Sequence, residues 1–201
     1  MESQNIQFEE DYIFRNNRSV TSIPDVALTE FIANAWDAGA YHVDMTIPSA
    51  FGQLISVEDD GTGMTNEEFH SRWMYLGYDR RKKQGEYVTF PSLADQTKRK
   101  AYGRNGVGRH GMFCFSNCYT VETWRDGLCN KYKIRASSGD NPYIIAEHNT
   151  FEKAGHGTKI YTEVERHLPN AQQIKEILSV RFLYDPKFIL TINGEHIRRR
   201  S

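Results

Sequence analysis

Apolar positions spaced three and four residues apart predict a helix that begins near Ser22 and ends at Gly39. Ser22, Pro24 and Asp25 are residue types typical of a helix start, and we expect Ser22 to be the N-cap. Glycine commonly ends a helix in the left-handed conformation, which suits Gly39. The predicted apolar face of this helix consists of Leu28, Phe31, Ile32, Ala35 and Trp36.

Alternating apolar and polar positions follow, and they predict an antiparallel pair of strands at residues 41–47 and 54–58. Thr65 and Glu68 then have the spacing of a capping box, which predicts the start of a second helix. The apolar stripe of this second helix consists of Phe69, Trp73 and Leu76.

The second half of the chain has mainly the pattern of strands joined by turns. Asp126-Gly127 predicts a tight hairpin between strands at 118–125 and 128–136. The remaining predicted elements are a short helix from Val107 or Gly108, strands at 143–148, 158–164 and 188–193, and a helix at 171–182. This order predicts an α/β (α+β) two-layer sandwich, with a mixed, mostly antiparallel sheet and helices on one face.

Length and composition narrow the class of protein. The 201 residues suffice for one good-sized core, so we expect a single domain over residues 1–201. No apolar run is long enough to span a bilayer, and the N-terminus lacks the pattern of a signal peptide. Three cysteines without a C-x-x-C pair indicate reduced thiols. We therefore expect a cytoplasmic protein without a membrane partner.

Charge is distributed unevenly along the chain. Residues 19–71 contain no Lys or Arg but nine acidic side chains, whereas residues 72–109 contain ten basic and three acidic ones. Such runs are often solvated faces and loops. They would equally suit an acidic wall and a basic wall around a ligand that carries both a metal ion and phosphates.

Three polar side chains form a narrow stripe on the first predicted helix. Glu30, Asn34 and Asp37 are four and three residues apart, opposite the apolar face, and their neighbours are small apolar residues. An acidic solvent face is one interpretation. The other is a surface that contacts a ligand, with Asn34 as a neutral oxygen ligand for a metal ion and a carboxylate that deprotonates water.

A strand ending in Asp59-x-Gly61-x-Gly63 is the second feature. The glycines permit a sharp turn and the close approach of a planar ligand, and Asp59 can accept a hydrogen bond from an exocyclic amine. A plain turn has the same residue types. An EF-hand loop starting at Asp59 is excluded, because the required Glu at its twelfth position is missing.

The third feature is a glycine-rich segment that leads into the predicted short helix. Gly103, Gly106 and Gly108 free backbone N–H groups to bind phosphate oxygens. The segment is not a P-loop, because Gly-Lys-Ser/Thr does not follow. Its spacing also differs from the Rossmann fingerprint, and it follows a long loop rather than a strand.

In this order and at these spacings, the three features resemble one superfamily. The matching segments are E-x-x-x-N-x-x-D-A from Glu30 to Ala38, D-x-G-x-G from Asp59, G-x-x-G-x-G from Gly103, and Gly157-Thr158. They resemble the GHKL ATPases, which include gyrase B, the heat-shock chaperone, histidine kinases and MutL. The resemblance spans residues 22–164 and implies the Bergerat-type ATP-binding fold of that superfamily.

The resemblance also implies a role for individual residues. Glu30 would be the general base for the attacking water, and Asn34 would bind Mg²⁺ between the phosphates. Asp59, with Thr158 through a shared water, would bind the adenine amine, and the glycine-rich segment would hold the triphosphate. The residues assigned to ATP in this way are Asn34, Asp37, Asp59, Gly61, Gly63, Met64, Lys82, Lys98, Lys100, Gly103, Gly106, Val107, Gly108, Arg109 and Thr158.

Three segments are expected to have separate roles by the same resemblance. Residues 1–21 would be an N-terminal strap and residues 77–105 an ATP lid, with Lys82, Lys98 or Lys100 as the phosphate contact. Residues 19–71 would form the metal and adenine wall. The C-terminal transducer domain of hydrolysing members, which supplies a lysine to the γ-phosphate, is expected to be absent. We therefore expect the chain to bind ATP and to hydrolyse it slowly.

Glu30 favours the hydrolysing branches, because histidine kinases of this superfamily generally lack a carboxylate at that position. The residues around Trp73 and Gly106 resemble prokaryotic chaperone-like and MORC-like ATPases. The sequence thus predicts an Mg-dependent ATPase whose lid closure and dimerisation control a partner or a C-terminal domain. Two alternatives stay open: a nucleotide-gated binding module that hydrolyses little and contacts nucleic acid or a protein client, and a kinase-type phosphotransfer domain.

Overall fold

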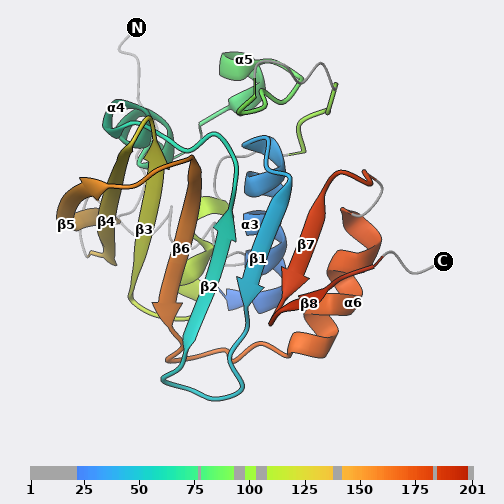
Figure 1. Ribbon diagram of the computed structural model, residues 1–201. Coiled ribbons are helices and arrows are strands. Elements are labelled where there is room, and N and C mark those ends of the chain that lie inside the picture. The colour runs from blue at the N-terminus through green and yellow to red at the C-terminus, as the bar shows by residue number, and fades with distance from the viewer. Residues whose placement is uncertain are drawn as a thin grey trace, which may run out of the picture.

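The computed structural model describes residues 22–76, 78–92, 98–102, 108–137, 142–182 and 185–198 (Figure 1). Within these ranges one sheet has the strand order β5-β4-β3-β6-β2-β1-β7-β8. Its strands are β1 (His42–Thr46), β2 (Leu54–Asp59), β3 (Cys118–Arg125), β4 (Leu128–Ala136), β5 (Tyr143–Glu152), β6 (Gly157–Glu163), β7 (Ile189–Ile192) and β8 (Glu195–His196). The helical elements are α3 (Pro24–Asp37), α4 (Asn66–Glu68), the π-helical η1 (Phe69–Trp73), α5 (Arg80–Gln84), the 3₁₀-helical η2 (Gly108–Cys114) and α6 (Ala171–Arg181).

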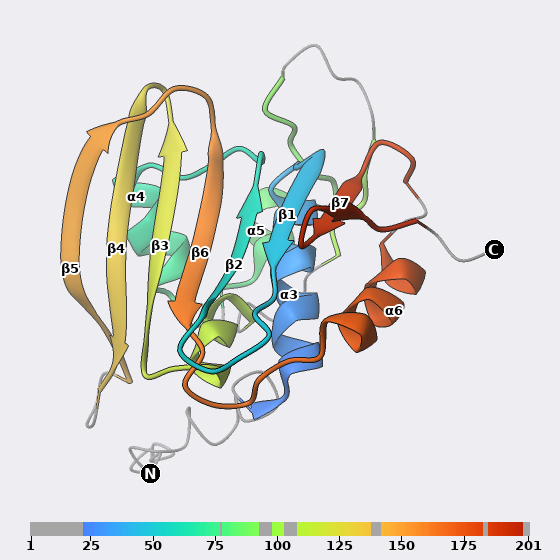
Figure 2. The same cartoon turned by 60° about the horizontal axis from the view of Figure 1, so that its bottom comes forward.

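The sheet confirms the predicted fold class. Among the described strands, β1 and β7 pair in parallel and all other neighbours are antiparallel. The helices α3 and α6 lie on the same side of the sheet (Figures 1 and 2). The molecule is therefore a mixed, mostly antiparallel sheet with a helical layer against one face.

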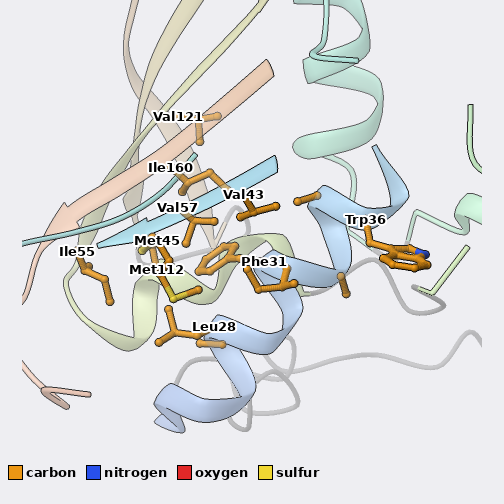
Figure 3. Packing of buried hydrophobic residues seen from close by; sticks show 14 of the residues in the cluster. Leu28, Phe31, Trp36, Val43, Met45, Ile55, Val57, Met112, Val121 and Ile160 are labelled. Atoms are coloured by element: carbon orange, nitrogen blue, oxygen red, sulfur yellow. The ribbon is translucent and has the colours of Figure 1, made fainter. Parts of the chain in front are cut away.

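The core lies between α3 and the central strands. Leu28 and Phe31 of α3 face Met45 of β1, Val57 of β2 and Met112 of η2 (Figure 3). All five are almost fully buried, as the predicted apolar face of the helix requires. This packing fixes the position of the opposite, polar side of α3.

The predicted N-cap of α3 is wrong by one residue. The helix begins at Pro24, its N-cap is Ile23, and no side chain caps it. A proline fits the first helical position, where its missing N–H is not needed, and it favours an extended residue before it. Ile23 has such a conformation, at φ −119° and ψ 106°. The other end agrees with the prediction, because the helix ends at Asp37 and Gly39 has φ +75°.

Several other local predictions are confirmed. The strands β3 and β4 have the predicted bounds, and Asp126 and Gly127 have φ values of +55° and +83°, as a type I′ hairpin requires. The capping box of Thr65 and Glu68 is present. The α-helix after the capping box is short, because α4 passes directly into the π-helical η1. The elements α5 and β8 were not predicted from the sequence.

The other face of the sheet carries cross-strand ion pairs. Lys159 Nζ lies 2.9 Å from Glu58 Oε2, and Lys131 Nζ lies 3.1 Å from Glu122 Oε1. Opposite charges on neighbouring strands stabilise a solvent-facing sheet surface. No helix in the described part of the chain is both long and apolar enough to cross a bilayer.

Candidate functional site

A row of polar side chains crosses the end of the otherwise apolar inner face of the sheet. Because side chains alternate along a strand, Asp59 follows Val57 on that face of β2. Asp59 is paired with Thr158 on β6, which is paired with Thr123 on β3. The two threonine Oγ1 atoms lie 3.2 Å apart. The sequence predicted the first two members, whereas Thr123 had no motif to mark it.

Asp59 is almost completely buried, and its Oδ1 accepts a 2.9 Å hydrogen bond from the backbone N–H of Gly61. Burial raises the pKa of its carboxyl from 3.8 to about 7, and the Gly61 hydrogen bond opposes this rise only in part. Near neutral pH the side chain can therefore accept one hydrogen bond as a carboxylate or donate one as an acid.

Two glycines bring the neighbouring elements close to Asp59. A Cβ on Gly61 would lie 2.7 Å from Ala38 Cβ, so a side chain there would force the end of α3 away. Gly63 has φ +62°, and a Cβ on it would lie 3.1 Å from the carbonyl oxygen of Gly157. Only glycine fits such a left-handed position against a backbone. The turn after β2 thus needs both glycines of the motif.

The polar stripe of α3 is partly buried, as expected for a surface that contacts a ligand. The Nδ2 atom of Asn34 is buried and has no hydrogen-bond partner among the described residues. Asp37 Oδ1 accepts a 2.6 Å hydrogen bond from the backbone N–H of Tyr102, and Asp37 Oδ2 lies 3.9 Å from Arg80 Nε. An unpaired buried amide is costly, which makes Asn34 a candidate for contact with a ligand.

Glu30 lies one turn before Asn34 and is covered by the backbone of Gly108. A Cβ on Gly108 would lie 2.6 Å from Glu30 Cβ. Burial raises the pKa of the Glu30 carboxyl, the charge of Asp37 raises it further, and Arg181 lowers it. A glutamate of raised pKa beside a backbone that approaches this closely suits a general base.

These elements surround a cavity of about 430 Å³. Glu30 is not on its wall, but Asn34, Asp37, Asp59, Gly63 and Thr158 are. The other lining residues are Phe31, Ala38, Val57, Thr62, Met64, Glu68, Arg72, Trp73, Tyr78, Arg80, Gln84, Thr89, Arg109, Arg125 and Ile160. Its volume lies within the range of small-molecule binding sites.

Arginines form the basic part of this wall, and apart from Arg109 the sequence did not single them out. Arg72 and Arg125 both pair with Glu68, at 2.8 and 2.9 Å. Only the pair of Glu68 and Arg72, four residues apart on one helical face, could have been predicted from spacing. Arg80 comes from a basic run whose members look alike in sequence.

Of the arginines on the cavity wall, Arg80 contacts the polar stripe of α3, and Arg109 lies over the Tyr78 ring with its Cζ atom 5.6 Å from the ring centroid. Arg80 Nη2 donates to the carbonyl oxygen of Asp37 at 3.2 Å, and its side chain is 13% exposed. Burial lowers the pKa of Arg109 to about 10, an effect that Tyr119 and Tyr78 oppose, so the guanidinium stays charged at neutral pH. Both can attract an anionic ligand.

The lysines proposed from the sequence lie elsewhere. Lys82 is 83% exposed and pairs with Asp79 at 3.7 Å, and Lys98 and Lys100 are exposed as well. None of the three is on the cavity wall. Gly103, Gly106 and Val107 lie outside the described residues, as do residues 1–21 and parts of the segment 77–105.

A family model matches most of the chain. Residues 21–159 match the model described as "Histidine kinase-, DNA gyrase B-, and HSP90-like ATPase". The matched segment contains α3, β2, β3, α5 and η2, together with Thr158 of β6. No match was found among curated proteins. The matched range therefore includes nearly all of the cavity wall.

Proposed function

Because the chain belongs to the histidine kinase-, DNA gyrase B- and HSP90-like ATPases, we propose that its cavity binds Mg-ATP and that Glu30 serves the hydrolysis of ATP. The observation that carries the proposal is the meeting of two features in one cavity. They are the buried carboxyl of Asp59 and the buried Nδ2 atom of Asn34, which has no hydrogen-bond partner in the described part of the chain. The first suits a nucleobase and the second suits the polar end of the same ligand.

The adenine ring would lie at the Asp59 end of the cavity. The Asp59 carboxylate would accept a hydrogen bond from the exocyclic amine, and Thr158 would take part through a shared water. Gly63 and the apolar side chains of Val57 and Ile160 leave a smooth, mainly apolar surface for the ring. A planar base needs such a surface with a few polar groups that fix its orientation.

The phosphates would lie between the polar stripe of α3 and the arginines. Asn34 is the residue that would hold Mg²⁺, through its Oδ1 atom, while its buried Nδ2, which has no partner among the described residues, would donate to a phosphate oxygen. A bound Mg²⁺ would neutralise phosphate charge and hold the phosphate oxygens in place. Arg80 and Arg109 would supply the remaining positive charge, with the backbone N–H groups near Gly108.

Glu30 would take the proton of the attacking water. Its carboxylate is the side chain one turn from Asn34, and its raised pKa makes it a better proton acceptor than an exposed glutamate. Gly108 lies close against one side of it. The same contact means that the start of η2 sets the position of the carboxylate.

We further propose that residues 77–105 act as a lid whose closure over ATP promotes the pairing of two copies and controls a protein partner. The support lies in the contacts of α5. Arg80 donates a hydrogen bond to the carbonyl oxygen of Asp37 at the end of α3, and the side-chain amide of Gln84 lies 3.0 Å from the Tyr78 hydroxyl. Both Arg80 and Gln84 line the cavity, so the segment already touches the proposed site.

The proposal is tested with Glu30→Gln, which keeps the size of the side chain and removes the base. We expect ATP affinity within about twofold of wild type and turnover lower by roughly 10²–10⁴-fold, the range for one general base. The matched control is Glu163→Gln on the exposed part of β6, which should leave both unchanged. Undiminished turnover in Glu30→Gln would remove Glu30 from the mechanism, and absent ATP binding in wild type would refute the proposal.

A further inference from the structure

Arg99 is a buried arginine in a cage of aromatic rings. Its side chain is 2% exposed, and its Cζ atom lies 4.3 Å from the ring centroid of Trp36 and 4.8 Å from that of Phe90. The rings of Phe188 and Tyr41 lie at 5.5 and 5.8 Å. A guanidinium this close to several ring faces is held by cation–π attraction.

The nitrogen atoms of Arg99 are directed at two oxygen groups. Nε donates to Oδ2 of Asp185 at 3.1 Å, and Nη1 donates to the carbonyl oxygen of Ala40 at 2.6 Å. Nη2 also lies 3.0 Å from Oδ2 of Asp185, as an ion pair without the geometry of a hydrogen bond. Asp185 belongs to the turn between α6 and β7, whereas Ala40 precedes β1. One side chain thus connects its own segment to two others that are remote in sequence.

The backbone around Arg99 crosses the end of α3. Trp36 Nε1 donates to the carbonyl oxygen of Lys100 at 2.9 Å, and the backbone N–H of Tyr102 donates to Asp37 Oδ1 at 2.6 Å. The backbone N–H of Val88 donates to the carbonyl oxygen of Arg99 at 2.8 Å. Residues 98–102 are therefore hydrogen-bonded on one side to residues 86–88 of the same proposed lid and on the other to the polar end of α3.

We propose that Arg99 is a positioning residue of the ATP site. It fixes where residues 98–102 cross α3, and through Tyr102 and Asp37 it sets the phosphate end of the cavity. The inference rests on the proposed function, since the site it positions is the ATP site. Arginine suits the task because its planar guanidinium lies against aromatic rings and at the same time donates to Asp185 and Ala40, which the compact ammonium of lysine does not do.

A purely structural ion pair is the competing explanation, because a buried pair is weak evidence of any function. The two explanations predict different effects on the affinities for ATP and for adenosine. A structural role would lower stability and weaken all ligands together. A positioning role at the phosphate end would weaken ATP and leave adenosine binding intact, because adenosine reaches only the Asp59 end.

The experiment uses the full chain with Arg99→Lys and Asp185→Asn. The second variant keeps Arg99 in its aromatic cage and removes only the charge of its partner, whose side chain is 16% exposed. Dissociation constants for ATP and for adenosine are measured by calorimetry, with unfolding followed in parallel. Glu195→Gln is the control, since it breaks the ion pair with Lys175 in the same C-terminal part without touching residues 98–102.

We expect both variants to bind ATP about tenfold more weakly, within the usual range of coupling between sites, and adenosine within about twofold of wild type. Glu195→Gln should bind both as wild type does. Equal weakening of both ligands, or no weakening of either, would overturn the inference while leaving the proposed function in place. A wild-type chain that binds neither ligand would overturn the proposed function, and this inference with it.

Discussion

The side chain of Glu30 on α3 lies against the backbone of Gly108, the first residue of η2, so closely that no Cβ could fit between them. The two residues are 78 positions apart in the sequence. Their contact joins the acidic stripe of the first helix to the end of the glycine-rich segment. It explains why glycine is required at position 108 even though its backbone is not in the left-handed region.

Gly108→Ala is therefore expected to damage the site by crowding. The added methyl would displace either Glu30 or the start of η2, at a cost of about 1–3 kcal/mol of unfolding free energy, as for other overpacked positions. Urea unfolding and ATP turnover measure the two effects. Gly85→Ala is the control, because nothing lies within 4 Å of a Cβ there and only left-handed strain, about 1 kcal/mol, is added. Wild-type turnover in Gly108→Ala would contradict the close contact.

The buried carboxyl of Asp59 predicts that the stability of the protein depends on pH. Its folded-state pKa of about 7 lies above the ordinary value of 3.8, so the folded protein without ligand holds this proton more tightly than the unfolded chain does. The resulting stability is complete below pH 3.8 and is lost as the pH rises through about 7.

Asp59→Asn has no such proton to lose. Relative to wild type, its unfolding free energy should rise by up to about 4 kcal/mol between about pH 4 and about pH 8. Urea unfolding of both proteins across that pH range measures the difference between their unfolding free energies. The titration of all other groups cancels in this difference. A difference that does not change with pH would show that Asp59 is not buried as an acid.

Arg80 and Lys82 belong to the same helix, α5, but Arg80 lines the cavity whereas Lys82 is exposed. Arg80→Gln should weaken ATP binding by roughly tenfold or more, since a hydrogen bond to a charged group contributes about 1.5–3 kcal/mol. Lys82→Gln should change ATP affinity by less than about twofold, because the Lys82 side chain is 83% exposed and is not on the cavity wall, and exposed charges contribute little. Calorimetric titration of both variants with ATP measures the two effects. A larger loss of ATP affinity in Lys82→Gln than in Arg80→Gln would assign the phosphate contact to Lys82 instead.

Much of the fold could be predicted from the sequence because its signals are local. The Asp126-Gly127 turn predicts the hairpin of β3 and β4 residue for residue, since both positions need a positive φ. The predicted N-cap of α3 was wrong for a local reason as well, because Pro24 favours the first helical position more strongly than Ser22 favours the N-cap position.

The site was predictable only where a motif spans it. Asp59, Gly61 and Gly63 are close in sequence, and their mutual contacts follow from one turn. The contact of Arg80 with Asp37 depends instead on how residues 43 positions apart meet, and no spacing encodes it. From the sequence we therefore expected the phosphate contact from lysines that are exposed in the structure, because a sequence does not show which of several basic residues is buried.

The most direct test of the central claim is a calorimetric comparison of Mg-ATP and Mg-GTP on the wild-type chain and on Asp59→Asn. Adenine offers an amine at the ring position where guanine has a carbonyl oxygen, so at about pH 8, above the Asp59 pKa of about 7, the carboxylate can accept at that position only from adenine. We predict that wild type binds ATP at least about tenfold more tightly than GTP, and that Asp59→Asn loses most of this difference. Equal affinity of wild type for the two nucleotides, or unchanged ATP preference in Asp59→Asn, would contradict the account.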